Sequence, residues 1–326
     1  MAALAAVLVA VGCAVPGFLP SAGSPRARSV ILISGDGMGP AHIQAARRDR
    51  SGLELDRLTE RGRMVSGPPA DGDETVTDSA AAATAWSTGT RTTNGSVGVD
   101  PDGDPLPTFG RAAEAAGRAT GLVTTAAVTD ASPAAFFASV PDRTLDARIA
   151  RQYVDGGGPD VVLGGGRGVW NSDGLLDRAR AAGYRYADDA AALGAAGDGK
   201  LLGLFADGEL WRSGSPPALA TLTTAALQRL SADPDGFFLF VEEERVDEAS
   251  HANDGDAVLA AMRNLDAAVG VARAFAEDHP DTLLIVTGDH TDIPTPVLAV
   301  GPGSDQLTGE WPNTRLHDVL SAVIRA

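Results

Sequence analysis

The sequence predicts an α/β protein, a three-layer α/β/α sandwich with a mostly parallel central sheet. From Ser29 onward, short runs of β-branched and aromatic residues alternate with helical patterns, which is typical of a parallel sheet covered by helices. No repeat and no linker divides residues 29–326, so we expect them to form one domain. With 44% hydrophobic and 21% charged residues, the 326-residue chain has the composition of a folded globular protein.

Six short apolar runs, each ending where polar residues begin, predict buried strands. They are Ser29–Ser34, Gly121–Thr125, Asp160–Leu163, Gly236–Val241, Thr282–Thr287 and Pro296–Val300. Between the fourth and the fifth, Val258, Met262, Leu265 and Val269 recur at helical spacing, which predicts an amphipathic helix over Asp254–Ala276. This succession of strand, helix and strand indicates a βαβ crossover.

Residues 1–28 are interpreted as an export signal and a tether. The apolar stretch Ala2–Val15, of about 14 residues, suits a signal peptide and is too short to span a bilayer. Pro16–Arg28 is rich in proline, serine, glycine and alanine, as tethers are. Cys13 is the only cysteine, which excludes an internal disulfide and any cysteine-based metal site. We expect an exported protein, periplasmic or extracellular, for which a lipid anchor at Cys13 is an open variant.

The net charge of −17 argues against a polyanionic partner. Such a field repels nucleic acid and anionic membrane surfaces at long range. A small phosphorylated substrate stays compatible with it, because bound metal ions can make one site locally positive. We therefore expect no nucleic-acid partner and no membrane span.

Acidic residues and histidines gather where three of the predicted strands end. Asp36 follows the first strand between two glycines, Asp247 and His251 follow the fourth strand four residues apart, and Asp289 and His290 follow the fifth. Open parallel sheets place their sites beyond the carboxyl ends of the strands, and carboxylate with imidazole suits zinc. Each group alone would be interpreted as an ordinary turn or a solvated acidic segment. Three of them in a chain with five histidines predict a metal centre.

Ser79 precedes a run of alanines, so it is predicted to lie at the start of a helix. One interpretation is a simple helix cap. The other is a nucleophile, since a helix N-terminus attracts phosphate and a bound cation lowers the pKa of a serine hydroxyl. Asp78 is an equally good cap, which leaves Ser79 available for chemistry.

Five segments, in this order along the chain, resemble the alkaline phosphatase family. They are Ile33–Gly39, Val76–Ala81, Asp130–Ala135, Val241–His251 and Thr287–His290. Quieter stretches match as well, so that the resemblance covers essentially all of residues 29–326. Five ordered motifs are far more specific than any one of them.

The resemblance implies hydrolysis of small phosphate monoesters through a phosphoserine intermediate, with release of inorganic phosphate, at a centre of two Zn²⁺ and one Mg²⁺. Ser79 would be the nucleophile, Arg143 would clamp the phosphate and Asp130 would lie close to the magnesium. The implied ligands are Asp247 and His251 for the first zinc; Ser79, Asp289, His290 and Asp36 for the second; and Asp36, Glu242 and Ser132 for the magnesium. A homodimer is left open.

The chain departs from the family pattern after His290, which only 36 residues follow. Members carry a third histidine on the first zinc in a motif that is missing here. Asp292, His317, His42 or a water would have to replace it, although His317 is expected in a final helix, Thr314–Ile324, and to face solvent there. A slower enzyme is the expected consequence.

Two alternatives stay open at this point. One is a catalytically silent relative that binds phosphate or metal, and the other is the same fold acting on phosphodiesters or sulfate esters. Glu243 is a further departure, because the family usually has glycine there. This extra acid is expected either to perturb the magnesium site or to face solvent.

Overall fold

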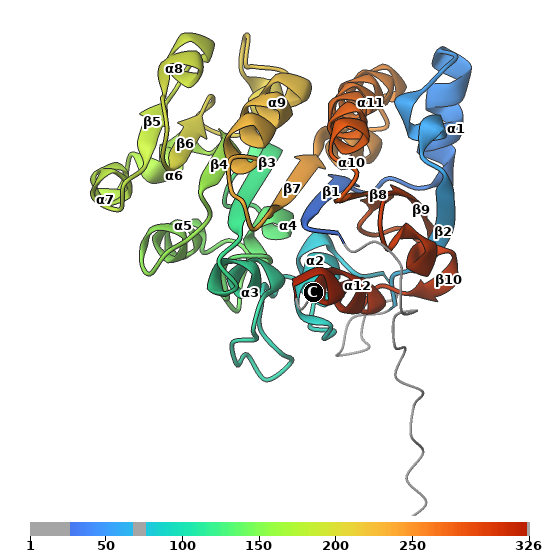
Figure 1. Ribbon diagram of the computed structural model, residues 1–326, viewed down its shortest axis with the longest axis horizontal. Helices are drawn as coiled ribbons and strands as arrows, with labels where there is room; N and C mark the ends of the chain where they lie inside the picture. Colours follow the sequence, from blue (N-terminus) through green and yellow to red (C-terminus); the bar gives the residue numbers. More distant parts are fainter. Residues whose placement is uncertain (1–26, 68–75, 325–326) are drawn as a thin grey trace, which may run out of the picture.

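Ten strands form one mixed sheet in the computed structural model, which describes residues 27–67 and 76–324 (Figure 1). The strands lie in the order β10-β2-β9-β8-β1-β7-β3-β4-β6-β5, with seven parallel and two antiparallel pairings. Their bounds are β1 Ser29–Gly35, β2 Glu60–Val65, β3 Ala119–Ala127, β4 Val161–Gly165, β5 Arg185–Ala187, β6 Leu201–Leu204, β7 Phe237–Glu243, β8 Thr282–Gly288, β9 Thr295–Val300 and β10 Gly309–Pro312.

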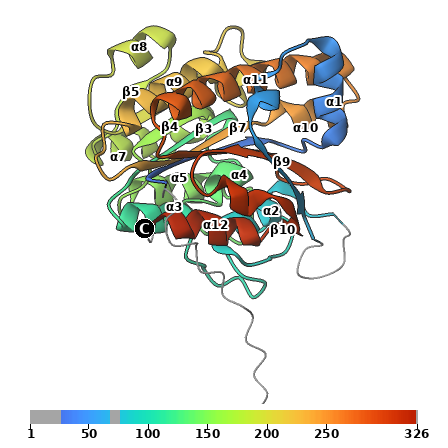
Figure 2. The ribbon, with the colours of Figure 1, turned by 45° about the vertical axis from the view of Figure 1, so that its right-hand side comes forward.

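Helices cover both faces of this sheet, as Figure 2 shows from the side. One face carries α2 Ser79–Thr88, α3 Phe109–Ala115, α4 Ala131–Ala134, α5 Asp146–Val154, α6 Arg167–Trp170, α7 Leu175–Ala181 and α12 Arg315–Ile324. The other carries α1 Pro40–Asp49, α8 Ala190–Ala195, α9 Leu219–Leu230, α10 Arg245–His251 and α11 Gly255–Asp278. The short 3₁₀ helices are η1 Glu54–Arg57, η2 Leu210–Arg212 and η3 Ser304–Leu307. The predicted three-layer α/β/α sandwich is confirmed.

All six predicted strands are present, as β1, β3, β4, β7, β8 and β9. The sequence missed β2, β5, β6 and β10, because these strands are short or carry polar residues on an exposed side. Strand β9 runs antiparallel to both β2 and β8. The predicted crossover helix is α11, and its N-cap Asp254 accepts the backbone N–H of Ala257 at 3.1 Å.

The register of the central strands brings the predicted site residues to one edge of the sheet. Gly35, at the end of β1, pairs with Glu243 at the end of β7 and with Gly288 at the end of β8. Residues that follow these three parallel strands therefore emerge at the same level.

Residues 1–26 lie outside the described part of the chain, so the predicted leader, the greater part of the tether and Cys13 stay predictions. Within residues 27–67 and 76–324, no helix is both long and apolar enough to cross a membrane.

Candidate metal centre and nucleophile

A tight turn after β1 aims Asp36 into the site. Gly37 has a φ of +60°, a conformation that favours glycine, and its N–H donates to Asp289 Oδ1 at 2.8 Å. A Cβ at residue 37 would lie 2.3 Å from Asp247 Oδ1. The turn thus packs the ends of β1 and β8 and the start of α10 against one another, which requires glycine at this position.

Ser79 opens α2, as predicted, and Asp78 is its N-cap. The carboxylate of Asp78 accepts the N–H of Ala81 at 2.9 Å, so that the Ser79 hydroxyl is not used for capping. Instead, Ser79 Oγ lies 3.3 Å from each carboxylate oxygen of Asp36 and 3.2 Å from His290 Nε2. The predicted nucleophile and two predicted metal ligands therefore meet in one place.

Three candidate ligand atoms converge beside this hydroxyl. Asp36, Asp247 and His290 each offer one, and all three lie within 4.8 Å of one another. Burial and then the charge of Asp289 raise the pKa of Asp36 to about 8. Burial opposes protonation of His290, but the charge of Asp289 and the contact with Asp36 raise its pKa to about 10. The site concentrates negative charge that a divalent cation would neutralise.

Two buried oxygen atoms in the site are suited to metal ions. Asp289 Oδ2 and Ser132 Oγ are both shielded from solvent and have no hydrogen-bond partner among the described residues. A buried oxygen without a partner is costly, and coordination to a cation would satisfy it. Both atoms belong to residues that the family resemblance assigns to metals, in the loop after β8 and in α4.

Glu242, the predicted magnesium ligand on β7, is also buried, and its Oε2 accepts the Thr124 hydroxyl at 2.6 Å. Burial and the charge of Asp36 raise the pKa of Glu242 well above its usual range. Asp247 and His251 lie on one face of α10, as the spacing predicts, with His251 Nε2 at 3.1 Å from Asp247 Oδ2. The His251 side chain is 77% exposed, so it lies at the open side of the site.

Arg143 forms ion pairs with two carboxylates. Its Nη2 donates to Asp130 Oδ1 at 2.7 Å and its Nη1 donates to Asp78 Oδ2 at 3.3 Å. Because Asp78 also caps the helix that begins with Ser79, the guanidinium is oriented relative to that hydroxyl. Arginine in this setting can offer a planar fork to two phosphate oxygens.

The three residues that could replace the missing histidine lie in different parts of the structure. His42 is engaged on both ring nitrogens, which contact the Gly39 N–H and Ser250 Oγ, each at 3.0 Å. His317 does lie in α12, but it is partly buried rather than solvent-facing: its Nδ1 is 2.9 Å from the carbonyl of Ser87, near the opposite end of α2 from Ser79. Asp292 is exposed on the loop after β8.

Glu243 does not face solvent, so the second of the two alternatives for this residue is wrong. The side chain is buried against α11, on the opposite face of the sheet from Glu242, where its oxygens accept from Thr125 Oγ1 and Asn264 Nδ2. Sequence reasoning also missed Thr124 and Thr125. Two consecutive hydroxyls at the end of a predicted buried strand were the available signal.

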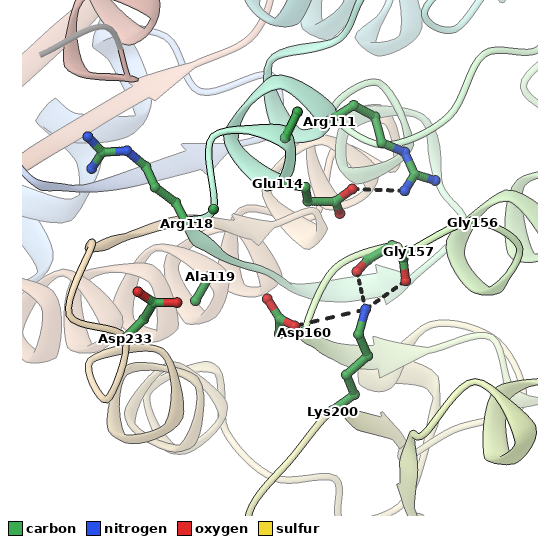
Figure 3. Close-up of a pocket in the computed structure, with 12 residues that line it drawn as sticks. Arg111, Glu114, Arg118, Ala119, Gly156, Gly157, Asp160, Lys200 and Asp233 are labelled. Atoms are coloured by element: carbon green, nitrogen blue, oxygen red, sulfur yellow. Dashed lines mark hydrogen bonds and ion pairs between the residues drawn. The ribbon is translucent and has the colours of Figure 1, made fainter.

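A cavity of about 550 Å³ lies at the other edge of the sheet, away from these residues (Figure 3). Arg118, Asp160 and Lys200 line it and precede β3, β4 and β6. Its charged groups are already engaged, since Lys200 Nζ donates to the Gly157 carbonyl at 2.6 Å and Arg111 pairs with Glu114 at 2.9 Å. This cavity is not part of the candidate site.

Residues 27–302 match the family model for alkaline phosphatase. Among individual proteins, the chain is 37% identical to alkaline phosphatase 4 of Bacillus subtilis over 81% of this chain and 61% of that protein. It is 35% identical to streptomycin-6-phosphate phosphatase of Streptomyces griseus, over 93% of this chain and 91% of that protein. The chain thus spans less than two thirds of the Bacillus relative.

Solved structures agree with these sequence matches. The alkaline phosphatase of the Antarctic bacterium TAB5 superposes with a TM-score of 0.86 at 27% identity, covering 93% of this chain and 99% of that one. A variant of that phosphatase holds Mg in a site called M3.

Proposed function

Because this chain belongs to the alkaline phosphatase family, we propose that it hydrolyses small phosphate monoesters and releases inorganic phosphate. The convergence of Ser79 Oγ with Asp36 and His290 at the N-terminus of α2 carries this proposal. A hydroxyl placed at a helix N-terminus, among candidate metal ligands and near an arginine fork, is suited to attack phosphorus.

The residues present would hold two Zn²⁺ and one Mg²⁺. When bound, these ions supply positive charge that activates a hydroxyl and neutralises charge on the transferred phosphoryl group. Asp289 Oδ2 and Ser132 Oγ support this assignment as buried oxygens without a hydrogen bond. The proposed ligands are Asp247 and His251 for the first zinc; Asp36, Ser79, Asp289 and His290 for the second; and Asp36, Glu242 and Ser132 for the magnesium.

The chain's own groups suggest the course of the reaction. Ser79 Oγ attacks phosphorus in line with the leaving oxygen, and the bond from phosphorus to that oxygen breaks. The serine proton passes to solvent and the leaving oxygen takes one up, which gives a phosphoserine and an alcohol. Arg143 orients two non-bridging oxygens, and the free N–H groups at the start of α2 face the same charge. Water then cleaves the phosphoserine, releasing phosphate and restoring the hydroxyl.

The deciding experiment measures phosphate release from an aryl phosphomonoester at alkaline pH, after chelation and after Zn²⁺ and Mg²⁺ are restored. We expect turnover that requires metal and is absent from Ser79→Ala. A folded, metal-loaded protein with no turnover above that variant would instead support the silent alternative, in which the site binds phosphate or metal without chemistry. Aryl phosphodiesters and sulfate esters assayed in parallel test the other alternative.

One specific substrate class has its own support. The Streptomyces griseus phosphatase named for streptomycin 6-phosphate is matched over 91% of its length, and this chain's net charge of −17 favours a cationic leaving group. We therefore include cationic phosphate monoesters such as streptomycin 6-phosphate as candidate substrates. A value of kcat/KM for streptomycin 6-phosphate no higher than for glycerol phosphate would exclude this class.

The organisation of the chain is also part of the proposal. Residues 1–28 would direct export and tether the fold, and residues 29–326 would be the phosphatase domain. N-terminal sequencing of the protein recovered outside the cytoplasm, with fatty-acid labelling at Cys13, tests cleavage and anchoring. Sedimentation of the purified protein tests the homodimer.

A further inference from the structure

A second glutamate lies directly beside Glu242, on the opposite face of the sheet. Glu242 accepts the Thr124 hydroxyl at 2.6 Å, on the face that carries α2 and α4. Glu243, the last residue of β7, accepts the Thr125 hydroxyl at 3.1 Å on the face that carries α11. Two threonine–glutamate hydrogen bonds thus join the carboxyl ends of β3 and β7, one on each face of the sheet.

Glu243 is buried without a counter-charge in contact. Its side chain is 1% exposed, and no ion pair among the described residues includes it. Its second oxygen accepts Asn264 Nδ2 at 2.5 Å, and the backbone N–H of Arg245 also bonds to this carboxylate, so its hydrogen-bond donors are neutral groups. The charge of the Arg245 side chain acts on it without an ion-pair contact. Placing an acid in such a buried position is costly. An apolar residue would avoid that cost, so we expect the hydrogen bonds of Glu243 to serve a function.

These interactions fix the strand ends that carry two proposed metal ligands. The Glu243 carbonyl accepts the backbone N–H of Asp36 at 3.1 Å. Thr125 Oγ1, already bonded to Glu243, also accepts the N–H of Glu244 at 2.9 Å. Through Asn264, the same side chain ties this corner to the long helix α11. Movement of Glu243 would therefore displace Glu242 and Asp36 together.

We propose that Glu243 is a positioning residue, which holds Glu242 and Asp36 in the arrangement that binds metal from the far face of the sheet. This inference rests on the proposed function. Residues that orient metal ligands from behind typically change metal affinity or activity by about 10- to 100-fold when removed. A residue that only supports the fold would change stability and leave metal affinity unaltered.

The test compares Glu243→Ala with Asp266→Ala. Asp266 is a matched control, because it is also 1% exposed, lies on α11 and accepts a neutral donor, the Leu55 N–H at 3.0 Å. The readouts are kcat on an aryl phosphomonoester and the Mg²⁺ concentration that half-saturates the rise in unfolding midpoint of the metal-depleted protein. For Glu243→Ala we expect kcat to fall and the half-saturating Mg²⁺ concentration to rise, each by about 10- to 100-fold.

Asp266→Ala is expected to lower the unfolding midpoint while both readouts stay within about threefold of the parent. Glu243→Gln keeps the shape and one acceptor, so it should restore much of the Mg²⁺ response. Glu243→Ala with an unchanged Mg²⁺ response, or an equal loss in Asp266→Ala, would overturn the inference. If the parent showed no turnover, the proposed function would fail, whereas the Mg²⁺ titration would still decide the role of Glu243.

Discussion

The hydroxyl oxygen of Ser79 is equidistant from the two carboxylate oxygens of Asp36, at 3.3 Å from each. The two residues come from different elements, since Asp36 follows β1 and Ser79 begins α2. Neither side chain depends on the other alone for its position. The Gly35–Gly37 turn fixes the acid and the Asp78 cap fixes the helix start, so the contact is a consequence of the fold rather than of local sequence.

Replacing Ser79 by alanine is predicted to abolish turnover without unfolding the protein. Asp78 rather than Ser79 caps α2, so the helix start should survive. Loss of a nucleophile removes the covalent route, and we expect kcat to fall by about 10³-fold or more. Steady-state kinetics and the thermal unfolding midpoint of the metal-loaded variant check this. Turnover retained within about tenfold would mean that Ser79 is not the nucleophile.

Arg143→Lys is predicted to weaken phosphate handling although the charge is kept. Lysine cannot bridge Asp78 and Asp130 with a planar fork, so the positive charge loses its orientation. We expect kcat/KM to fall by about 10- to 100-fold and the inhibition constant of inorganic phosphate to rise. Arg178→Lys, in an exposed ion pair with Asp155, serves as the control and should change neither value. Equal behaviour of the two variants would refute the role of the fork.

Much of the architecture could be predicted because buried parallel strands have a strong apolar signature. Runs such as Ser29–Ser34 and Thr282–Thr287 are apolar at every position between their terminal serine or threonine residues, since both faces of these strands are covered. Strand β2 was missed for the opposite reason. Its sequence alternates exposed charged residues with a single fully buried side chain, Met64, and depends on β9 and β10 for pairing.

The candidate site divides in the same way. Asp36, Asp289 and His290 follow strands whose ends the sequence marks, so their convergence could be expected. The partners of Glu243 could not, because Thr125 and Asn264 are 118 and 21 residues away from it and meet it only through the packing of β3 and α11 on β7. The face of the sheet on which a side chain lies depends on the register of its strand. A register shift of one residue moves each side chain to the opposite face.

Gly37→Ala is predicted to weaken metal binding, in addition to destabilising the protein through its backbone conformation. Any L-residue at a φ of +60° is strained by about 1–2 kcal/mol. The added Cβ would also lie 2.3 Å from Asp247 Oδ1 and displace that carboxylate. We expect the Zn²⁺ concentration needed for half-maximal activity to rise about tenfold or more.

Gly52→Ala separates these two effects. Gly52 has a similar φ of +75°, and nothing lies within 4 Å of the position its Cβ would take. This variant should lose stability to a similar extent and keep its Zn²⁺ response. If both alanine variants needed the same Zn²⁺ concentration as the parent, Asp247 would not be a ligand that this turn constrains.

Ser132→Ala is predicted to change the metal-free and the metal-loaded protein in opposite directions. Ser132 Oγ is buried without a hydrogen-bond partner, so removing it should raise the free energy of unfolding of the metal-free protein by about 1 kcal/mol. If that oxygen is a magnesium ligand, the same change should weaken the stabilisation that Mg²⁺ provides.

Thr282→Val is the comparison, because Thr282 Oγ1 is also buried without a partner but lies at the amino end of β8, far from the site. It should stabilise both forms equally. Chemical denaturation of the parent and both variants, with and without Mg²⁺, measures these effects. A Ser132→Ala protein with an undiminished Mg²⁺ effect would remove Ser132 from the proposed ligands.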